Sequence, residues 1–408
     1  MRRIFLIPAL VAMLAAPLAA QVTLPGASLP RVGEVLDTMT DTLDEALETT
    51  SQTAGNLARE RLRAIDRLVR RNRDTIALDM RGEPARRGEL LAMEVDTASL
   101  KRATAAGFTV LEVKLVEGLD FIVTRLGVPE GMSLAEAERE LTRLMPEALV
   151  AADNLHFQSG ATRSTVLPVA SAATGGFGPS VPVGMIDGAP GRAVPVVASK
   201  GFARGAPYPS NHGSAVASLL ASAGATAIRV ADVYGTDKAG GNALAIAKGL
   251  GWLVTEGSRV VTISLVGPQN PVLARAIEAA QRKGVVVVAA VGNAGPAAPP
   301  AYPASYQGVV AVTAVDGRRR ALLEAGRALH LDYAAPGANI RALDAKGKRQ
   351  RLRGTSFAAP LVAARVALAL GDNRNWRAAL DGEALDLGRK GTDPVYGRGL
   401  VCASCKGL

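Results

Sequence analysis

The sequence has little of the residue types that commonly build metal and redox sites. Of its 408 residues only two are cysteines, Cys402 and Cys405, and only three are histidines. Four sulfur ligands for a structural zinc ion are therefore missing, and no histidine lies near the two cysteines in the sequence. The C-x-x-C spacing lies at the end of the chain, outside any βαβ context, so we expect a local disulfide of an oxidising compartment and no redox role.

Long apolar runs and aromatic residues are also scarce. Aromatics make up 4% of the chain, and basic residues are not interleaved with them as is typical of nucleic-acid binding. After residue 20 no stretch is long and apolar enough to span a bilayer. We therefore expect neither a nucleic-acid partner nor a stable membrane span in the mature protein.

The net charge of +10 is unevenly distributed. Residues 1–165 carry 20 basic and 23 acidic side chains, whereas residues 166–408 carry 27 and 14. Two parts of one chain with opposite net charge attract each other. The alternative is that the second part has a basic, solvated surface.

The first twenty residues have the pattern of a secretory signal peptide. Met1, Arg2 and Arg3 precede an apolar stretch that ends in small residues, with Ala20/Gln21 as the expected cleavage point. The sequence thus predicts a signal peptide at residues 1–20 and export to the periplasm or the extracellular space.

Residues 21–87 are expected to form a helical N-terminal arm. Within residues 31–71, apolar and small side chains recur at about 3.5-residue spacing, which predicts a long amphipathic helix. The arm either self-associates or packs on its own protein. Residues 81–87 are rich in turn formers and are interpreted as a break.

Residues 88–158 predict a small ferredoxin-like α+β domain in the order β-α-β-β-α-β. Ser133 with Glu136 has the spacing of a capping box. Residues 159–182 have little periodicity and predict a linker. The expected strands are 90–95, 108–116, 119–126 and 148–157, and the expected helices are 97–106 and 133–144.

From residue 183 to residue 401 the pattern is that of an α/β domain. Short apolar runs alternate with helical stretches, and unbroken runs such as residues 285–288 are typical of strands covered on both faces. We expect a mainly parallel sheet between helices, with active groups at the carboxyl ends of its strands. The apolar runs and helical stretches of this domain are 183–186, 215–222, 228–233, 243–255, 260–265, 272–282, 285–291 and 309–315. We expect residues 402–408 to form a C-terminal tail.

Four polar residues lie at strand ends or helix starts of this domain. Asp187, Asn293, His212 and Ser356 would each, alone, be an ordinary turn, cap or structural residue. Together they match the needs of one reaction, in which an imidazole activates a serine hydroxyl, a buried carboxylate orients the imidazole, and fixed donors stabilise an oxyanion.

These residues lie in segments that resemble the subtilisin-like serine peptidases, or subtilases. The matching blocks are residues 183–187, 212–217, 287–293 and, most specifically, Gly354-Thr355-Ser356-Phe357-Ala358-Ala359-Pro360. The resemblance implies a triad of Asp187, His212 and Ser356. It also implies an oxyanion hole formed by the Asn293 side chain and the backbone N–H of Ser356. The family's order of Asp, His and Ser is the same.

The resemblance also implies how a polypeptide substrate binds. Family members hold an extended peptide between two strands, and the corresponding residues are Ser264, Leu265, Val266 and Gly267 on one side and Ala239, Gly240 and Gly241 on the other, with Val291 and Gly292 at the pocket. Val266 stands where the family usually has Gly, so a narrower pocket edge is expected. Gly188 stands where the family has Thr or Ser after the aspartate. We expect no metal site and no cofactor.

Residues 88–158 resemble the inhibitor-type propeptide of subtilases in pattern. The resemblance implies a prodomain that assists folding, blocks the cleft and is cut off near Phe157-Gln158-Ser159-Gly160. The alternative is a permanent accessory domain. The whole sequence thus predicts an exported, autoprocessed serine endopeptidase. Two alternatives are a catalytically silent peptide binder of the same fold and an envelope interaction protein that assembles through residues 31–71.

Overall fold

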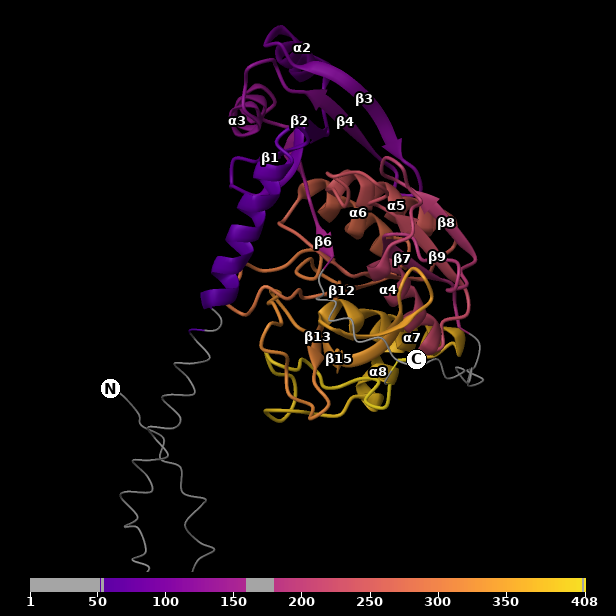
Figure 1. Cartoon of the computed structure of the whole chain (residues 1–408). Helices are drawn as coiled ribbons and strands as arrows, with labels where there is room; N and C mark the ends of the chain where they lie inside the picture. The colour runs from indigo at the N-terminus through magenta and orange to yellow at the C-terminus, as the bar shows by residue number, and fades with distance from the viewer. Residues whose placement is uncertain (1–51, 53–54, 159–179, 406) are drawn as a thin grey trace, which may run out of the picture. The chain divides into compact units, whose positions relative to one another are not determined.

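The computed structural model describes residues 52, 55–158, 180–405 and 407–408. The chain divides into two compact units, residues 1–50 and residues 51–408, and only the second contains described residues (Figure 1). The predicted signal peptide, most of the predicted linker and the first part of the predicted arm lie outside the described residues.

A seven-stranded sheet forms the centre of residues 180–405. Its neighbouring strands are all parallel, in the order β14-β13-β12-β10-β7-β9-β8. The predicted parallel α/β sheet is thus confirmed. The strands are β7 (Val183–Asp187), β8 (Ala198–Gly201), β9 (Ile228–Asp232), β10 (Val260–Ile263), β12 (Val286–Ala290), β13 (Val310–Val315) and β14 (Tyr333–Pro336).

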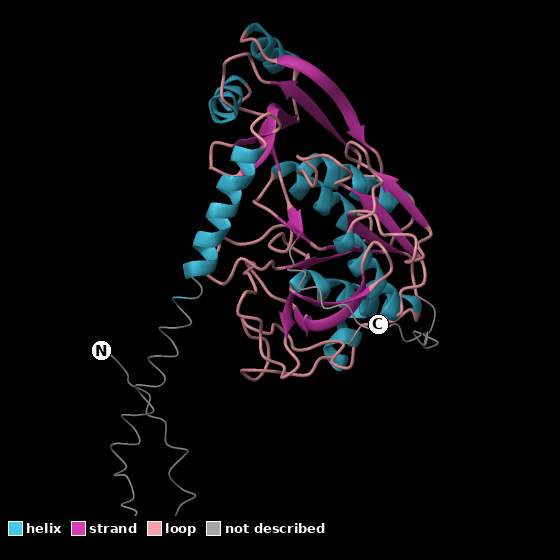
Figure 2. Cartoon of the chain, viewed as in Figure 1, coloured by secondary structure: helices cyan, strands magenta, loops and turns pink. Residues whose placement is uncertain are grey.

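Helices cover both faces of this sheet (Figure 2). α4 (Asn211–Ser222) and α7 (Ala359–Gly371) share one apolar core with it. α5 (Ala243–Thr255) and α6 (Pro271–Arg282) share the core on the opposite face. Because every central strand is buried on both sides, its sequence is apolar without alternation, as in residues 286–290.

Several shorter elements complete the large domain. The hairpin β15 (Ala338–Leu343) and β16 (Arg349–Arg353) leads into the 3₁₀ turn η1 (Thr355–Phe357), and α8 (Trp376–Glu383) follows α7. The two-residue strand β11 (Leu265–Val266) directly follows β10. Cys402 and Cys405 form a disulfide, as expected from their spacing.

A small antiparallel domain precedes the large sheet. The long strand β2 pairs with β1, β4 and β5, and β3 pairs with β4. The helices pack on one face of this sheet. The elements are β1 (Ile76–Leu78), β2 (Pro84–Met93), α2 (Thr97–Ala105), β3 (Thr109–Val116), β4 (Phe121–Gly127), α3 (Leu134–Leu144), β5 (Leu149–Asn154) and β6 (Phe157–Gln158).

Two details of this domain differ from the prediction and one agrees. β2 begins at Pro84, inside the segment interpreted as a break, and β1 was not predicted. β1 is only three residues long and exists by pairing with β2, so it leaves no periodicity to detect. The predicted capping box is confirmed, because Ser133 accepts from Glu136 N and the Glu136 carboxylate accepts from Ser133 N.

The predicted arm is helical over residues 55–71 within the described part of the chain. One side of this helix contacts the large domain. An ideal Cβ on Gly295 would lie 3.0 Å from Leu57 Cδ1. Leu62, on another side, is 61% exposed. In the part of the chain that the structure describes, no helix is both long and apolar enough to cross a bilayer.

Candidate active site

A carboxylate and an imidazole meet at the carboxyl end of the central strand β7. Asp187 is the last residue of β7 and is fully buried. Its Oδ2 lies 2.8 Å from Nδ1 of His212, which is 6% exposed. Nε2 of His212 is buried and has no hydrogen-bond partner among the described residues. The imidazole is thus held at one nitrogen, while the other can accept a proton from a further group.

His212 lies in the first turn of α4, whereas the sequence predicted it just before the helix. α4 begins at Asn211 because Ser210 is the N-cap and its hydroxyl accepts from Gly213 N at 2.9 Å. A Cβ on Gly213 would overlap the carbonyl oxygen of Gly188. Glycine after His212 therefore lets α4 approach the loop that follows Asp187.

Ser356 lies in η1 and not in the first turn of the following helix, which begins at Ala359. The residue is fully buried. Its hydroxyl donates to Ser264 O at 3.1 Å, and Ser264 Oγ donates to Ser356 O at 2.9 Å. η1 lies against α4, and the rings of His212 and Phe357 are 5.5 Å apart. Ser356 is thus fixed to the start of β11 and lies close to α4.

Asn293 follows β12, and its amide is oriented by the turn that carries Ser356. Thr355 N donates to Asn293 Oδ1 at 3.0 Å, and Thr355 Oγ1 donates to Gly292 O at 3.1 Å. The amide oxygen is therefore occupied. Nδ2 is buried without a hydrogen-bond partner in the described ranges. A buried amide N–H₂ in this state can donate to a negative charge that develops beside it.

Residues 155–158 lie between the two segments that the sequence predicted as substrate-binding strands. β6 pairs antiparallel with β11, so that Gln158 is opposite Leu265 and Phe157 is opposite Val266. On the other side, His156 N donates to Gly241 O at 2.8 Å and Tyr234 Oη donates to His156 O at 2.7 Å. The end of the small domain is thus held in the cleft as an additional strand.

A cavity of about 730 Å³ lies beside this strand. Val266 and Val291 line it from the large domain, and Leu57 and Ile65 line it from helix 55–71. An ideal Cβ on Gly292 would lie 3.2 Å from Val266 Cγ1. Val266 therefore lies close to the backbone of Gly292 at the pocket edge.

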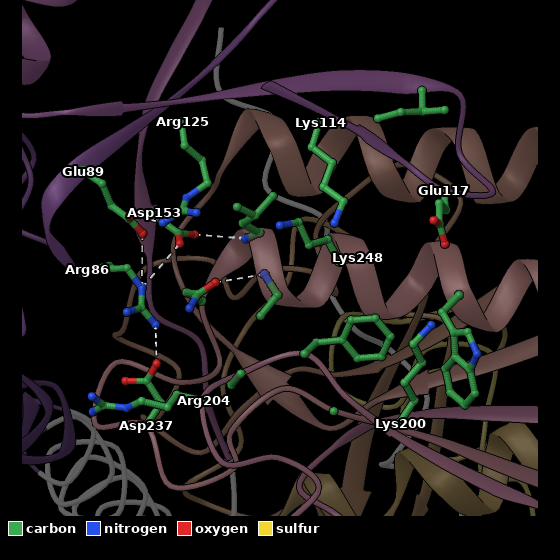
Figure 3. A pocket seen from close by; sticks show the side chains of 18 residues that line it. Arg86, Glu89, Lys114, Glu117, Arg125, Asp153, Lys200, Arg204, Asp237 and Lys248 are labelled. Carbon is green, nitrogen blue, oxygen red and sulfur yellow. Dashed lines mark hydrogen bonds and ion pairs between the residues drawn. The ribbon is translucent and has the colours of Figure 1, made fainter. Parts of the chain in front are cut away.

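The interface between the two domains is apolar at its centre and charged at its rim. The free face of the small sheet shares a core with α5 and α6. Arg86 Nη2 lies 2.6 Å from Asp237 Oδ2 (Figure 3). Lys248 Nζ lies 3.3 Å from Glu112 Oε2. The Asp153 carboxyl accepts from Leu244 N at the start of α5. Burial raises the pKa of Asp153 to about 7.

The other two histidines lie outside this constellation. Burial lowers the pKa of His156 to about 4, so its ring is neutral at pH 7. The alternation of Leu329, Leu331 and Tyr333 in the sequence predicts a strand around His330, but β14 begins only at Tyr333. His330 Nε2 lies 2.8 Å from Val309 O. The strand prediction was wrong, because Leu329 is exposed and the chain pairs with β13 only from Tyr333 onward.

Two residues of the site were not identified from the sequence. Thr355 orients Asn293, and Gln158 Nε2 donates to Asp187 Oδ1 at 2.9 Å. Neither contact has a sequence signal, since the partners are 62 and 29 residues apart. Gly188 was identified as unusual, and it lies beside this second contact.

Comparison with known proteins gives consistent matches. The Peptidase_S8 model, described as the subtilase family, matches residues 197–385. These residues include His212, Asn293 and Ser356, whereas Asp187 precedes them. Subtilisin Savinase of Lederbergia lenta is 34% identical over 199 residues, which cover 47% of this chain and 71% of that protein. Subtilisin DY of Bacillus licheniformis is 32% identical over 257 residues, covering 56% and 91%.

Other relatives are longer than the part of their own chain that this chain matches. The chain covers 50% of an alkaline protease of Shouchella clausii, at 34% identity over 47% of this chain. Among solved structures, fervidolysin of Fervidobacterium pennivorans, a keratinolytic enzyme related to subtilisin, aligns with a TM-score of 0.64 and 19% identity. The alignment covers 79% of this chain and 61% of that chain. This structural likeness indicates a common fold.

Proposed function

The chain belongs to the subtilase family of serine endopeptidases, and on this basis we propose that it is an exported, autoprocessed endopeptidase with Ser356 as nucleophile. The observation that carries the proposal is the Asp187–His212 pair at one strand end, beside a buried serine. Export is supported by the signal-like residues 1–20 and by the disulfide Cys402–Cys405, since disulfides persist in oxidising compartments.

His212 would act as the general base through Nε2. The Ser356 hydroxyl leaves Ser264 O, gives its proton to Nε2, and its Oγ attacks the carbonyl carbon of the scissile bond. Asp187 holds Nδ1–H of the imidazole and stabilises the imidazolium. The imidazolium then protonates the leaving amine as the C–N bond breaks. In the second half of the reaction water gives a proton to His212 and attacks the acyl carbon, and the Ser356 oxygen leaves with that proton.

The developing oxyanion would be bound by Asn293 Nδ2 and by the backbone N–H of Ser356. The side-chain donor is already oriented, because Thr355 N occupies Asn293 Oδ1. Orientation before the reaction is what makes such donors effective, since no reorganisation is needed as the charge forms. This arrangement needs no metal or cofactor.

Residues 88–158, together with β1 and the start of β2 in the same sheet, would act as an intramolecular inhibitor. Their last residues fill the cleft, and cross-domain ion pairs hold their sheet on the large domain. The register of β6 supports one choice of scissile bond. Gln158 is opposite Leu265, and Leu265 is preceded by Ser264, whose carbonyl is bound to the Ser356 hydroxyl. We therefore propose cleavage between Ser159 and Gly160.

Expression of the full chain tests this function. The wild-type chain is expected to yield a fragment that begins at Gly160 and to hydrolyse denatured casein. Ser356→Ala is expected to stay uncut and inactive. Ser199→Ala, which changes an exposed serine, serves as the matched control and should behave as the wild type. Purified Ser356→Ala that cuts itself at the wild-type rate would refute the proposal.

A further inference from the structure

Among the described residues, the Asp187 carboxylate has three hydrogen-bond donors, and one of them comes from the small domain. Oδ2 faces His212 Nδ1, whereas Oδ1 accepts from Gly188 N at 2.7 Å and from Gln158 Nε2 at 2.9 Å. Asp187 is fully buried. A buried carboxylate that loses a donor is left partly unsatisfied, which is costly in a site without access to water.

Gly188 lies between the N-cap of α4 and the Gln158 amide. An ideal Cβ on Gly188 would lie 2.5 Å from Ser210 Oγ and 3.7 Å from Gln158 Nε2. Ser210 cannot move away freely, because its hydroxyl caps α4 through Gly213 N. Residue 188 therefore carries no side chain that could donate to Asp187, and the amide of Gln158 occupies the neighbouring space.

The backbone fixes Gln158 at this place. β6 pairs with β11 on one side of the cleft, and the preceding residue His156 is bonded to Gly241 and Tyr234 on the other. The His156 ring also packs on Gly267, where an ideal Cβ would lie 2.6 Å from the ring. Residue 158 is thus the second residue before the proposed scissile bond, with its side chain directed at the triad carboxylate.

We propose that Gln158 is a positioning residue: its carboxamide, on the strand that occupies the substrate position, donates a hydrogen bond that orients Asp187. The enzyme accordingly prefers peptides with glutamine in this position. The inference rests on the proposed function. Its substrate class is polypeptides with a glutamine two residues before the cut, because this side chain has the length and the N–H₂ group that reach Asp187 Oδ1. With a peptide that lacks such a donor, Gly188 N is the one donor to Oδ1 that remains among the described residues.

Self-cleavage of the full chain gives the first test. Gln158→Met keeps the length of the side chain but has no donor, and Gln158→Glu keeps its shape but presents a carboxylate to Asp187. We expect self-cleavage to slow by about tenfold or more for Gln158→Met, as for the loss of a hydrogen bond to a charged group. Gln158→Glu should be slower still. Gln307→Met, which changes an exposed glutamine, should leave the rate unchanged.

This order of rates separates positioning from simple fit. If Gln158 only filled space, the isosteric glutamate would be tolerated at least as well as methionine. Equal rates for Gln158, Gln158→Met and Gln158→Glu would overturn the inference. Melting temperatures of the same variants in the Ser356→Ala background report whether they fold.

Peptide hydrolysis by the processed enzyme gives the second test. The peptide His-Phe-Gln-Ser-Gly with blocked ends is compared with peptides that have methionine or glutamate in place of glutamine. The expected difference lies in kcat, with KM within about twofold, because the contact orients the catalytic carboxylate. Equal kcat for the three peptides overturns the inference while leaving the proposed function intact. Absence of any hydrolysis, together with an uncut wild-type chain, means that the proposed function itself fails.

Discussion

At the scale of single residues, Asn293 illustrates how the site is prepared before a substrate binds. Its amide oxygen accepts from Thr355 N, so the buried N–H₂ group is the part left to donate. A flip of the amide would place two N–H groups opposite the N–H of Thr355 and is therefore unfavourable. The orientation of this donor is set by the turn that also carries Ser356.

Replacing Asn293 by alanine is expected to lower kcat by about 10² to 10³, as the loss of one such donor does in subtilisin. KM should change little, because the donor acts on the charge of the transition state. Steady-state hydrolysis of a chromogenic peptide by the processed enzyme measures both constants. A loss confined to KM would mean that Asn293 binds substrate and does not stabilise the oxyanion.

The sequence predicted the residues of the candidate site, but not how their side chains are held. Asp187, His212, Asn293 and Ser356 could be found because each follows a recognisable strand or lies in a specific motif. The contacts of Gln158 and Thr355 could not, because they join residues that only the folded chain brings together. The start of α4 was also misplaced, although Ser210 three residues before Gly213 is a usable N-cap signal.

At the scale of elements, helix 55–71 forms an additional wall of the cavity beside the cleft. Leu57, Ile65 and Leu68 line that cavity together with Val266 and Tyr302. Arg61 also lies 2.8 Å from Glu83 of the small domain. The helix is thus anchored on both domains by one of its sides.

Leu57→Asp is expected to detach the first turns of this helix, because it places a charge against Gly295. In the uncut Ser356→Ala chain, trypsin should then cut within residues 59–71 up to about tenfold faster, since local opening costs less free energy. Leu62→Asp, on the exposed side, is the matched control. Equal cleavage rates for the two variants would show that Leu57 does not anchor the helix.

The elements of the large sheet were largely predictable, whereas the short pairing strands were not. Unbroken valine and alanine runs such as β12 carry a strong signal because both of their faces are buried. β6 and β11 are two residues long each and exist through their mutual pairing. Their sequences, Phe157–Gln158 and Leu265–Val266, carry no periodicity, and the predicted segments 148–157 and 260–265 each reached only the first residue of the pair. The family resemblance indicated the extended segment at residues 264–267.

At the scale of the whole molecule, the contact between the two domains contains a titratable group. Asp153 is fully buried against the start of α5, and burial raises its pKa to about 7. When the small domain leaves, this carboxyl becomes hydrated and its pKa falls towards the ordinary value. The docked state therefore binds the proton more tightly. The docked state is therefore stabilised fully below about pH 4, and this stabilisation is lost as the pH rises through 7.

Release of the cleaved small domain is therefore expected to accelerate between pH 5 and pH 8. The rate can be followed by size-exclusion chromatography of the processed complex at constant ionic strength. Asp153→Asn should remove this part of the pH dependence, because its amide oxygen still accepts from Leu244 N but does not titrate. An unchanged pH profile in Asp153→Asn would assign the effect to other groups.

The central claim is that Ser356 is a nucleophile activated by His212, and active-site labelling tests it most directly. The processed protein is treated with a peptidyl phosphonate, and the modified residue is mapped by tandem mass spectrometry. We expect a single adduct on Ser356 in the wild type and none in Ser356→Ala or His212→Ala. Labelling at another residue, or labelling that persists in Ser356→Ala, would contradict the claim.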